Sequence, residues 1–221
     1  MDVIYLDFRK AFDKLPHKRL IVKVKGHGIG GKIWGWIDDW RSGRKQRVIL
    51  NGRESHWIDV LSGVLQGSVL GPVLFVIYIN DIDSYVSSKI LKFADDTKIV
   101  SVVSRPEGVM QLRQDLVDLY RWSNDWLMLL NTVKCKVIHL GNKNPCVKYD
   151  LSGREVESIV EEKDLGILIT KDLKVRAQCS RAAKTENRVL GMIRRTFTCK
   201  DEQTIIQLYK SLVRPRLEYY V

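Results

Sequence analysis

Three aspartates stand where strand-like segments end, and they are the first sign of chemistry in this chain. Asp7 directly follows the apolar run at 3–6, and the pair Asp95-Asp96 interrupts the β-type residues of 89–103, which places that pair at a hairpin turn. If these strands pair, three carboxylates meet beside a core. Two such charges about 4 Å apart repel by about 4 kcal/mol at an effective dielectric of about 20. A divalent cation relieves that repulsion, and carboxylate oxygens suit Mg²⁺.

Two metal ions on shared carboxylates activate an attacking hydroxyl and stabilise a leaving phosphate oxygen. Each acidic position also has an ordinary interpretation. Asp-Asp is a common turn dipeptide, and Asp7 at a strand end suits a helix cap or a surface position. The three residues by themselves leave a catalytic metal site and a set of surface carboxylates both open.

The segments around these aspartates alternate between strand-like and helix-like patterns. Asn51-Gly52 between two apolar runs predicts a hairpin, and the glycine-rich stretch 63–72 predicts a loop before an apolar helix at 73–81. Trp122 and Trp126 share helical spacing with their apolar neighbours and are predicted to pack in a core. Interleaved helices and hairpins predict an α+β fold. The expected helices are 16–26, 106–130, 174–195 and 202–213, and the expected short strands are 137–140, 147–151 and 165–169.

Composition points to a polyanionic partner. The chain has 37 Lys+Arg against 26 Asp+Glu, a net charge of +11, which favours nucleic acid first and a membrane surface second. A basic protein with a merely solvated surface fits the charge equally well. The longest apolar run, 73–79, is too short to span a bilayer, so no membrane association is expected. The cysteines lack CxxC spacing, which argues against zinc and for free thiols inside the cell, in nucleus or cytoplasm.

Five stretches, in order along nearly the whole chain, resemble the motifs of one enzyme family. LDFRKAFD at 6–13 is similar to the first palm motif of reverse transcriptases from retrotransposons that lack long terminal repeats. GVLQGSVLGP at 63–72 resembles the second, and FADD at 93–96 resembles the third, the catalytic hairpin. NTVK at 131–134 resembles the fourth, and DLGI at 164–167 resembles the primer-grip region. Within that family the chain most resembles the jockey-like group of mobile elements.

The resemblance implies a metal site. Asp7 and Asp95 would bind two Mg²⁺ ions, with Mn²⁺ as a substitute, and the Phe8 carbonyl would add an oxygen ligand. Asp96 would support this cluster as a further metal-site carboxylate. The implied reaction is RNA-directed DNA synthesis, in which nucleotidyl transfer extends a DNA primer on an RNA template.

The resemblance also implies a site for the deoxynucleotide triphosphate. Phe12 would lie under the sugar and exclude a 2′-hydroxyl, a role compatible with a plain core position. Gln66 and Gly67 would lie against the nucleotide, because a glycine lets backbone approach closely. Lys134 would protonate or neutralise the departing pyrophosphate as a general acid, although it and the nearby Lys136 equally suit a surface position.

The same resemblance divides the chain into parts of a right-hand polymerase. Residues 1–170 would form the palm with partial fingers, of which 16–62 are fingers-like, and 171–221 would form a truncated, basic, helical thumb-like segment. The second motif departs from the family, which usually has proline where this chain has Leu65, so its loop is expected to be less rigid. Because the chain begins close to the first motif, a catalytically impaired nucleic-acid-binding remnant remains the alternative to an active polymerase, and a truncated product without a role is a third hypothesis.

Overall fold

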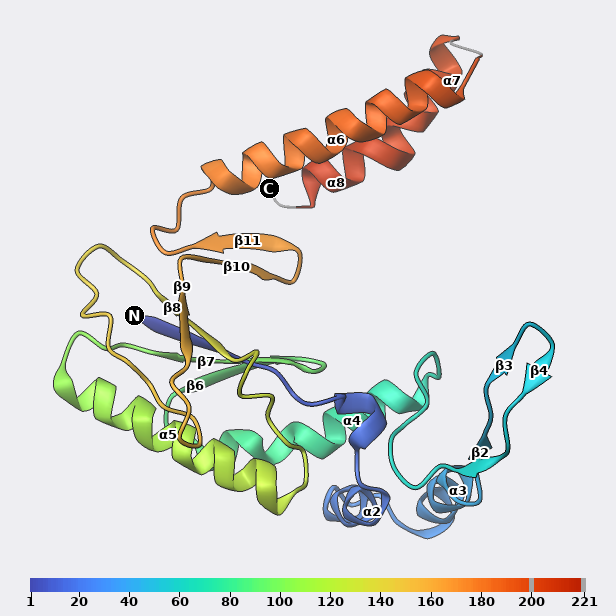
Figure 1. The fold of residues 1–221 in the computed structure, drawn as a ribbon, viewed down its shortest axis with the longest axis vertical. Helices are drawn as coiled ribbons and strands as arrows, with labels where there is room; N and C mark the ends of the chain where they lie inside the picture. The colour runs from blue at the N-terminus through green and yellow to red at the C-terminus, as the bar shows by residue number, and fades with distance from the viewer. Residues whose placement is uncertain (199–200, 220–221) are drawn as a thin grey trace. The chain divides into compact units, whose positions relative to one another are not determined.

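The computed structural model describes residues 1–198 and 201–219, and Figure 1 shows their helices and strands. The chain separates into two compact units. The first comprises Met1–Val137 and Asn144–Ser158, and the second comprises Ile138–Lys143 and Ile159–Val221. In the part of the chain that the structure describes, no helix is both long and apolar enough to cross a membrane.

The first unit holds most of a five-stranded sheet whose strand order is β6-β7-β1-β8-β9. β1 pairs antiparallel with β7, and β7 forms a hairpin with β6. Ile4 lies opposite Ile99, which lies opposite Ile90, so a row of β-branched side chains crosses three strands and faces the core. The strands are β1 Asp2–Leu6, β6 Lys89–Phe93, β7 Asp96–Ser101, β8 Lys136–His139 and β9 Glu157–Ile159.

Helices α4 and α5 run along one face of this sheet (Figure 1). Along α5, Leu112, Leu116, Leu119 and Trp122 recur at helical spacing and are all buried, so this helix closes the core. Helices α2 and α3 pack next to each other, and α2 also packs against α4. The helices are α1 Ala11–Lys14, α2 His17–Gly26, α3 Gly31–Arg41, α4 Leu70–Ile79, the 3₁₀ helix η1 Asn80–Tyr85 and α5 Pro106–Asp125.

A thin β arm connects α3 to the loop before α4. β2 Lys45–Gln46 pairs with β5 Ile58–Asp59, and β3 Ile49–Leu50 pairs with β4 Arg53–Glu54. Asn51 and Gly52 form the tip with φ of 49° and 75°, as a two-residue hairpin turn with two left-handed positions requires. The hairpin predicted at Asn51-Gly52 is confirmed.

The second unit joins a β-hairpin to a helical pair. β10 Glu161–Asp164 and β11 Ile167–Thr170 are antiparallel, and Leu165 and Gly166 turn between them. The long α6 Arg176–Thr196 packs against η2 Tyr209–Val213, a π-helical segment, and against α8 Arg214–Glu218, which follow α7 Glu202–Leu208. Packing thus groups this hairpin with the helices of the second unit. The expected division into a palm with partial fingers at 1–170 and a thumb-like segment at 171–221 stays a prediction.

The α+β class expected from the sequence is confirmed, with local corrections. α4 begins at Leu70, because a helix tolerates the following proline within its first turn. α5 ends at Asp125 and not at 130, because Leu127 adopts a left-handed φ of 53° and turns the chain back toward the sheet. The strand predicted at 147–151 is wrong, since that stretch contributes an isolated bridge between Asp150 and Glu155.

Candidate active site at the ends of the central strands

The pairing register of β1 and β7 sets the first and third motif-like segments side by side. Their ladder ends with Leu6 opposite Thr97, so the next residues in line are Asp7 and Asp96. Asp7 directly follows Leu6, and Asp96 directly precedes Thr97. Both of these ladder residues are buried, with exposed fractions of 4% and 3%. The backbone therefore delivers both aspartates to the same edge of the sheet.

The β6–β7 hairpin closes one residue earlier than the sequence predicted. Phe93 lies opposite Asp96, so the two-residue turn is Ala94 and Asp95, and Asp96 is the first residue of β7. Ala94 has a φ of 51°, which costs a residue with a Cβ roughly 1–2 kcal/mol. A strained turn that carries an acidic residue is typical of functional sites, where surrounding structure sustains the strain.

The backbone around Asp7 is held from the other side by the segment at 129–131. The Asn131 amide donates to the Asp7 carbonyl oxygen at 2.7 Å, and Phe8 forms an isolated antiparallel bridge with Leu130. Lys134 follows in a turn closed by its amide, which donates to the Asn131 carbonyl at 2.9 Å, and its side chain is exposed. The first and fourth motif-like segments are therefore adjacent.

Cys135 is a residue near this site that sequence reasoning missed. Its thiol is fully buried, and burial raises its pKa, while a hydrogen bond to the Asp7 backbone opposes this shift. The thiol therefore lies directly beside Asp7 as a neutral side chain. In the sequence, only its place directly after the motif-like segment 131–134 indicates that Cys135 lies near the site, because the cysteine spacing itself suggests no metal site.

A tight backbone approach joins the second motif-like segment to the first. The Gly63 amide donates to the Leu15 carbonyl at 2.8 Å, and the Val64 amide donates to the Phe12 carbonyl at 2.8 Å. A Cβ on Gly63 would lie 2.6 Å from the Asp13 carbonyl oxygen, so only glycine fits there. Phe12 itself is partly buried and stacks on Phe75 of α4, with ring centroids 4.6 Å apart.

The loop that carries Gln66 and Gly67 is folded onto itself. The Ser68 hydroxyl donates to the Leu65 carbonyl at 2.8 Å and accepts from the Gly71 amide at 2.9 Å. Gln66 and Gly67 are exposed at its tip, and Gly67 has a φ of 81°. These hydrogen bonds hold Leu65 without the proline usual in the family.

His17 and Arg44 clamp the start of this loop, a role the sequence did not indicate. His17 is buried, and its Nε2 lies 2.8 Å from the Gly63 carbonyl oxygen, which also accepts from Arg44 Nη2 at 3.0 Å. Burial lowers the pKa of His17, so the neutral ring donates this bond. His17 therefore lies in the core of the first unit.

The aspartate side chains differ in exposure. Asp7 is half-buried, whereas Asp95 and Asp96 are exposed. Among residues 1–198 and 201–219, no group of three or more His, Cys, Asp or Glu side chains is arranged to hold a metal ion. Convergence of the three carboxylates on a metal therefore stays a prediction. The donor set is suited to it, because carboxylate and carbonyl oxygens are the ligands that Mg²⁺ takes and exposed turn side chains change rotamer easily.

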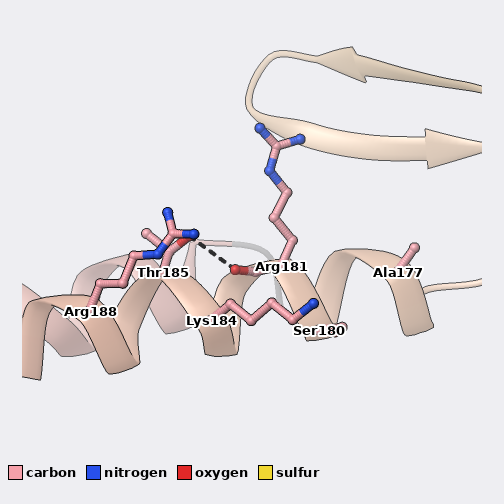
Figure 2. A pocket seen from close by; sticks show the side chains of 6 residues that line it. All are labelled: Ala177, Ser180, Arg181, Lys184, Thr185 and Arg188. Atoms are coloured by element: carbon pink, nitrogen blue, oxygen red, sulfur yellow. Dashed lines mark hydrogen bonds between the residues drawn. The ribbon is translucent and has the colours of Figure 1, made fainter.

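In the second unit, one face of α6 is strongly basic (Figure 2). The helix carries six Lys and Arg residues and a single acidic residue, Glu186. Arg181, Lys184 and Arg188 follow one another at spacings of three and four residues along the helix. Together with small side chains such as Ser180, they line a shallow cleft of about 440 Å³. Their charged groups lie on one side of the helix, as polyanion contacts require.

Comparisons with known proteins point to one family. The model of the family described as reverse transcriptase (RNA-dependent DNA polymerase) matches residues 3–193. The chain is 24% identical over 237 residues to the RNA-directed DNA polymerase from mobile element jockey of Drosophila melanogaster, which covers 97% of this chain and 25% of that protein. It is 31% identical over 140 residues to the probable RNA-directed DNA polymerase from transposon X-element of the same species, covering 59% of this chain and 15% of that protein.

A solved structure with a similar fold is that of telomerase from Candida tropicalis in complex with a TWJ fragment of telomeric RNA. It aligns with 99% of this chain and 38% of its own chain at a TM-score of 0.56 and 11% sequence identity. At that identity the likeness concerns the fold, and it agrees with a polymerase palm-like α+β arrangement. The chain spans about a quarter of the length of the jockey polymerases that it matches.

Proposed function

This chain belongs to the reverse transcriptase (RNA-dependent DNA polymerase) family, as a jockey-like member from a retrotransposon without long terminal repeats, and we propose that it extends a DNA primer on an RNA template. One observation carries the proposal: the β1–β7 register aligns Asp7 with Asp96 and brings the Asp95 turn to the same edge of the sheet. We place this activity inside the cell, in nucleus or cytoplasm.

The proposed metal site uses the oxygens at this edge. Enzymes of this family generally use divalent metals. Asp7 and Asp95 would hold two Mg²⁺ ions, with the Phe8 carbonyl and Asp96 completing the site and Mn²⁺ as a substitute. When bound, the ions supply activation of the primer hydroxyl and charge stabilisation at the transferred phosphate. Of these ligands, Asp7 would have the more firmly held backbone, because the Asn131 amide donates to its carbonyl oxygen at 2.7 Å.

The nucleotide would lie between the first and second motif-like segments. The Phe12 ring, supported by its stack on Phe75, would lie under the deoxyribose and leave no room for a 2′-hydroxyl. Gln66 and Gly67 are at the exposed tip of a loop that Gly63 anchors to the Phe12 segment, which would let them contact the nucleotide. The exposed Lys134 would donate a proton to the departing pyrophosphate.

The basic face of α6 would contact the phosphates of the RNA–DNA duplex. Phosphate contacts release counterions, so affinity should fall steeply with salt and depend little on sequence. Replacing Lys184 by glutamine, or Arg188 by glutamine, should make the slope of log affinity against log salt shallower by about one. Lys148→Gln is the matched control, because that lysine is exposed and already pairs with Glu155 at 2.9 Å. Equal slopes in all variants would contradict the role of α6.

The decisive test is primer extension by the 221-residue chain on an RNA template. We expect weak, Mg²⁺-dependent incorporation of deoxynucleotides that Asp95→Asn abolishes. Asp118→Asn, which changes an α5 carboxylate that pairs with Arg121 at 3.0 Å, should retain activity. A chain that binds RNA–DNA hybrid but fails to extend with Mg²⁺ and with Mn²⁺ would instead be a catalytically impaired nucleic-acid-binding remnant.

A further inference from the structure

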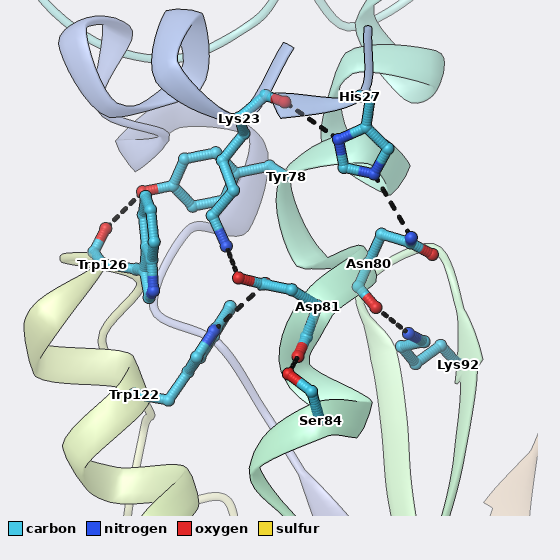
Figure 3. A network of polar contacts seen from close by, with 9 residues as sticks. All are labelled: Lys23, His27, Tyr78, Asn80, Asp81, Ser84, Lys92, Trp122 and Trp126. Carbon is cyan, nitrogen blue, oxygen red and sulfur yellow. Dashed lines mark hydrogen bonds and ion pairs between the residues drawn. The ribbon is translucent and has the colours of Figure 1, made fainter. Parts of the chain in front are cut away.

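A lysine is buried among aromatic rings where helices of the first unit meet (Figure 3). Lys23 of α2 has a side chain only 5% exposed, and its ammonium group pairs with Asp81 at the start of η1. Its nitrogen also lies 3.5 Å from the ring centroid of Trp126, 5.3 Å from Trp122 and 5.5 Å from Tyr78. We call these five residues the lysine cage. A buried ammonium group is costly unless it is paired, so the cage is a demanding arrangement.

Hydrogen bonds lock the aromatic walls of the lysine cage. The Trp122 indole N–H donates to Asp81 Oδ1 at 3.2 Å, and the Tyr78 hydroxyl donates to the Trp126 carbonyl. Asp81 therefore accepts from both Lys23 and Trp122. If Lys23 lost its charge, the partly exposed Asp81 carboxylate would turn toward water, and the Trp122 indole would lose its acceptor.

The lysine cage reaches the candidate active site through one ring contact. The Trp122 ring packs against the buried Phe8 ring, with centroids 6.4 Å apart and planes tilted by 58°. Phe8 is the residue after Asp7, and its backbone forms the bridge to Leu130. Two backbone hydrogen bonds flank that bridge. The Asn131 amide donates to the Asp7 carbonyl at 2.7 Å, and the Arg9 amide donates to the Leu129 carbonyl at 2.9 Å.

We propose that Lys23 is a positioning residue for Asp7: its ion pair with Asp81 orients Trp122, and Trp122 holds Phe8 so that the Asp7 backbone stays paired with the 129–131 segment. The charge of Lys23 thus sets the geometry of a proposed metal ligand without touching it. Only the catalytic consequence rests on the proposed polymerase function, because the position of the Asp7 backbone is measurable in any case.

Amide hydrogen exchange tests the positioning directly. In Lys23→Met, which keeps the aliphatic length and removes the charge, exchange of the Arg9 and Asn131 amides should accelerate about tenfold relative to amides of the β6–β7 ladder. Lys92→Met is the matched control, since Lys92 pairs with Asp83 at 2.8 Å on the same η1 segment and takes no part in the lysine cage. Unchanged exchange at Arg9 and Asn131, or equal acceleration throughout the first unit, would overturn the proposal.

A second variant separates charge from volume. Lys23→Met combined with Asp81→Asn removes both charges and keeps an amide oxygen that accepts from the Trp122 indole. We expect this double variant to recover exchange at Arg9 and Asn131 to within about threefold of the unmodified chain, because an intact acceptor still orients Trp122. Failure of the double variant to recover, while it remains folded, would mean that Lys23 acts by filling space. If Lys23→Met alone does not fold, the exchange measurement uses Trp122→Phe in its place. That variant deletes the hydrogen bond from the Trp122 indole to Asp81.

Primer extension then reports the catalytic consequence. Lys23→Met should lower kcat by tenfold to about a hundredfold with KM for the deoxynucleotide within about twofold, because a displaced metal ligand harms the chemical step more than nucleotide binding. A rise in KM at unchanged kcat would contradict positioning of Asp7. If the unmodified chain does not extend primers, the proposed function fails, whereas the exchange of Arg9 and Asn131 still decides the role of Lys23.

Discussion

Substituting Gly63 by alanine should be among the most damaging single-methyl changes in the first unit. Its added Cβ would lie 2.6 Å from the Asp13 carbonyl oxygen and 2.8 Å from the Phe12 carbonyl oxygen. Both contacts are with backbone, which cannot rotate away as a side chain does. Gly63 also has a φ of +86°, and its amide donates to the Leu15 carbonyl at 2.8 Å.

The magnitude follows from three terms. The left-handed φ costs an alanine roughly 1–2 kcal/mol. Relieving the overlap must stretch the two backbone hydrogen bonds that join the Gly63 loop to the Phe12 segment, which costs about 1–2 kcal/mol. Alanine restricts the unfolded chain and returns about 0.5–1 kcal/mol. The net loss of unfolding free energy is about 1–3.5 kcal/mol.

Urea unfolding followed by tryptophan fluorescence is the appropriate assay, because all six tryptophans lie in the first unit. Gly28→Ala is the control for backbone strain alone, since Gly28 has a φ of +78° and nothing within 4 Å of the added Cβ. Gly35→Ala, in the interior of α3 and equally open, should be stabilising by up to about 1 kcal/mol. If Gly63→Ala costs no more than Gly28→Ala, the close approach does not constrain the loop and the reasoning is refuted.

Three further outcomes follow from buried polar groups. Burial lowers the pKa of His17 below its value in the unfolded chain, so the unfolded state takes up the proton first as pH falls. The free energy of unfolding should therefore fall as pH drops from about 6.5 toward the lowered pKa. In urea melts at a series of pH values, His17→Gln should flatten this part of the pH dependence. Asp115→Ala removes the buried carboxylate that accepts from the Ser87 amide at 2.9 Å, and unfolding free energy should fall by about 1–3 kcal/mol. Tyr149→Phe should cost a similar amount in the same assay, because its hydroxyl donates to the buried Asp2 carboxylate at 2.6 Å; no loss in either variant would mean that water replaces the bond.

Local pattern predicted much of the first unit because its signals are short-ranged. The apolar run before Asp7 became β1, and Asn51-Gly52 became a hairpin tip. The spacing of Trp122 with its neighbours predicted a packed helix face, and that tryptophan is fully buried in α5. Each of these features depends on residues within a few positions of one another, which is the range over which strand and helix periodicity acts.

The boundaries were less predictable, because single backbone conformations determine them. Leu127 turns left-handed and ends the helical run that composition alone would continue. β10 consists of charged residues, Glu161–Asp164, and exists because it pairs with β11. Propensity favours neither outcome, and pairing or a single strained residue overrides it.

The sequence by itself determined the α+β class, the basic charge and the identity and order of the residues that resemble catalytic motifs. Only the tertiary structure decided which of them are adjacent: Asp7 with Asp96, the Gly63 loop with the Phe12 segment, and His17 with the Gly63 carbonyl across 46 residues of chain. It also singled out Lys23 from 37 basic residues, since nothing local distinguishes a buried ammonium group from a solvated one. The physical reason is that register, close approach and burial arise from groups far apart in the chain, and their free energies exist only once those groups are brought together.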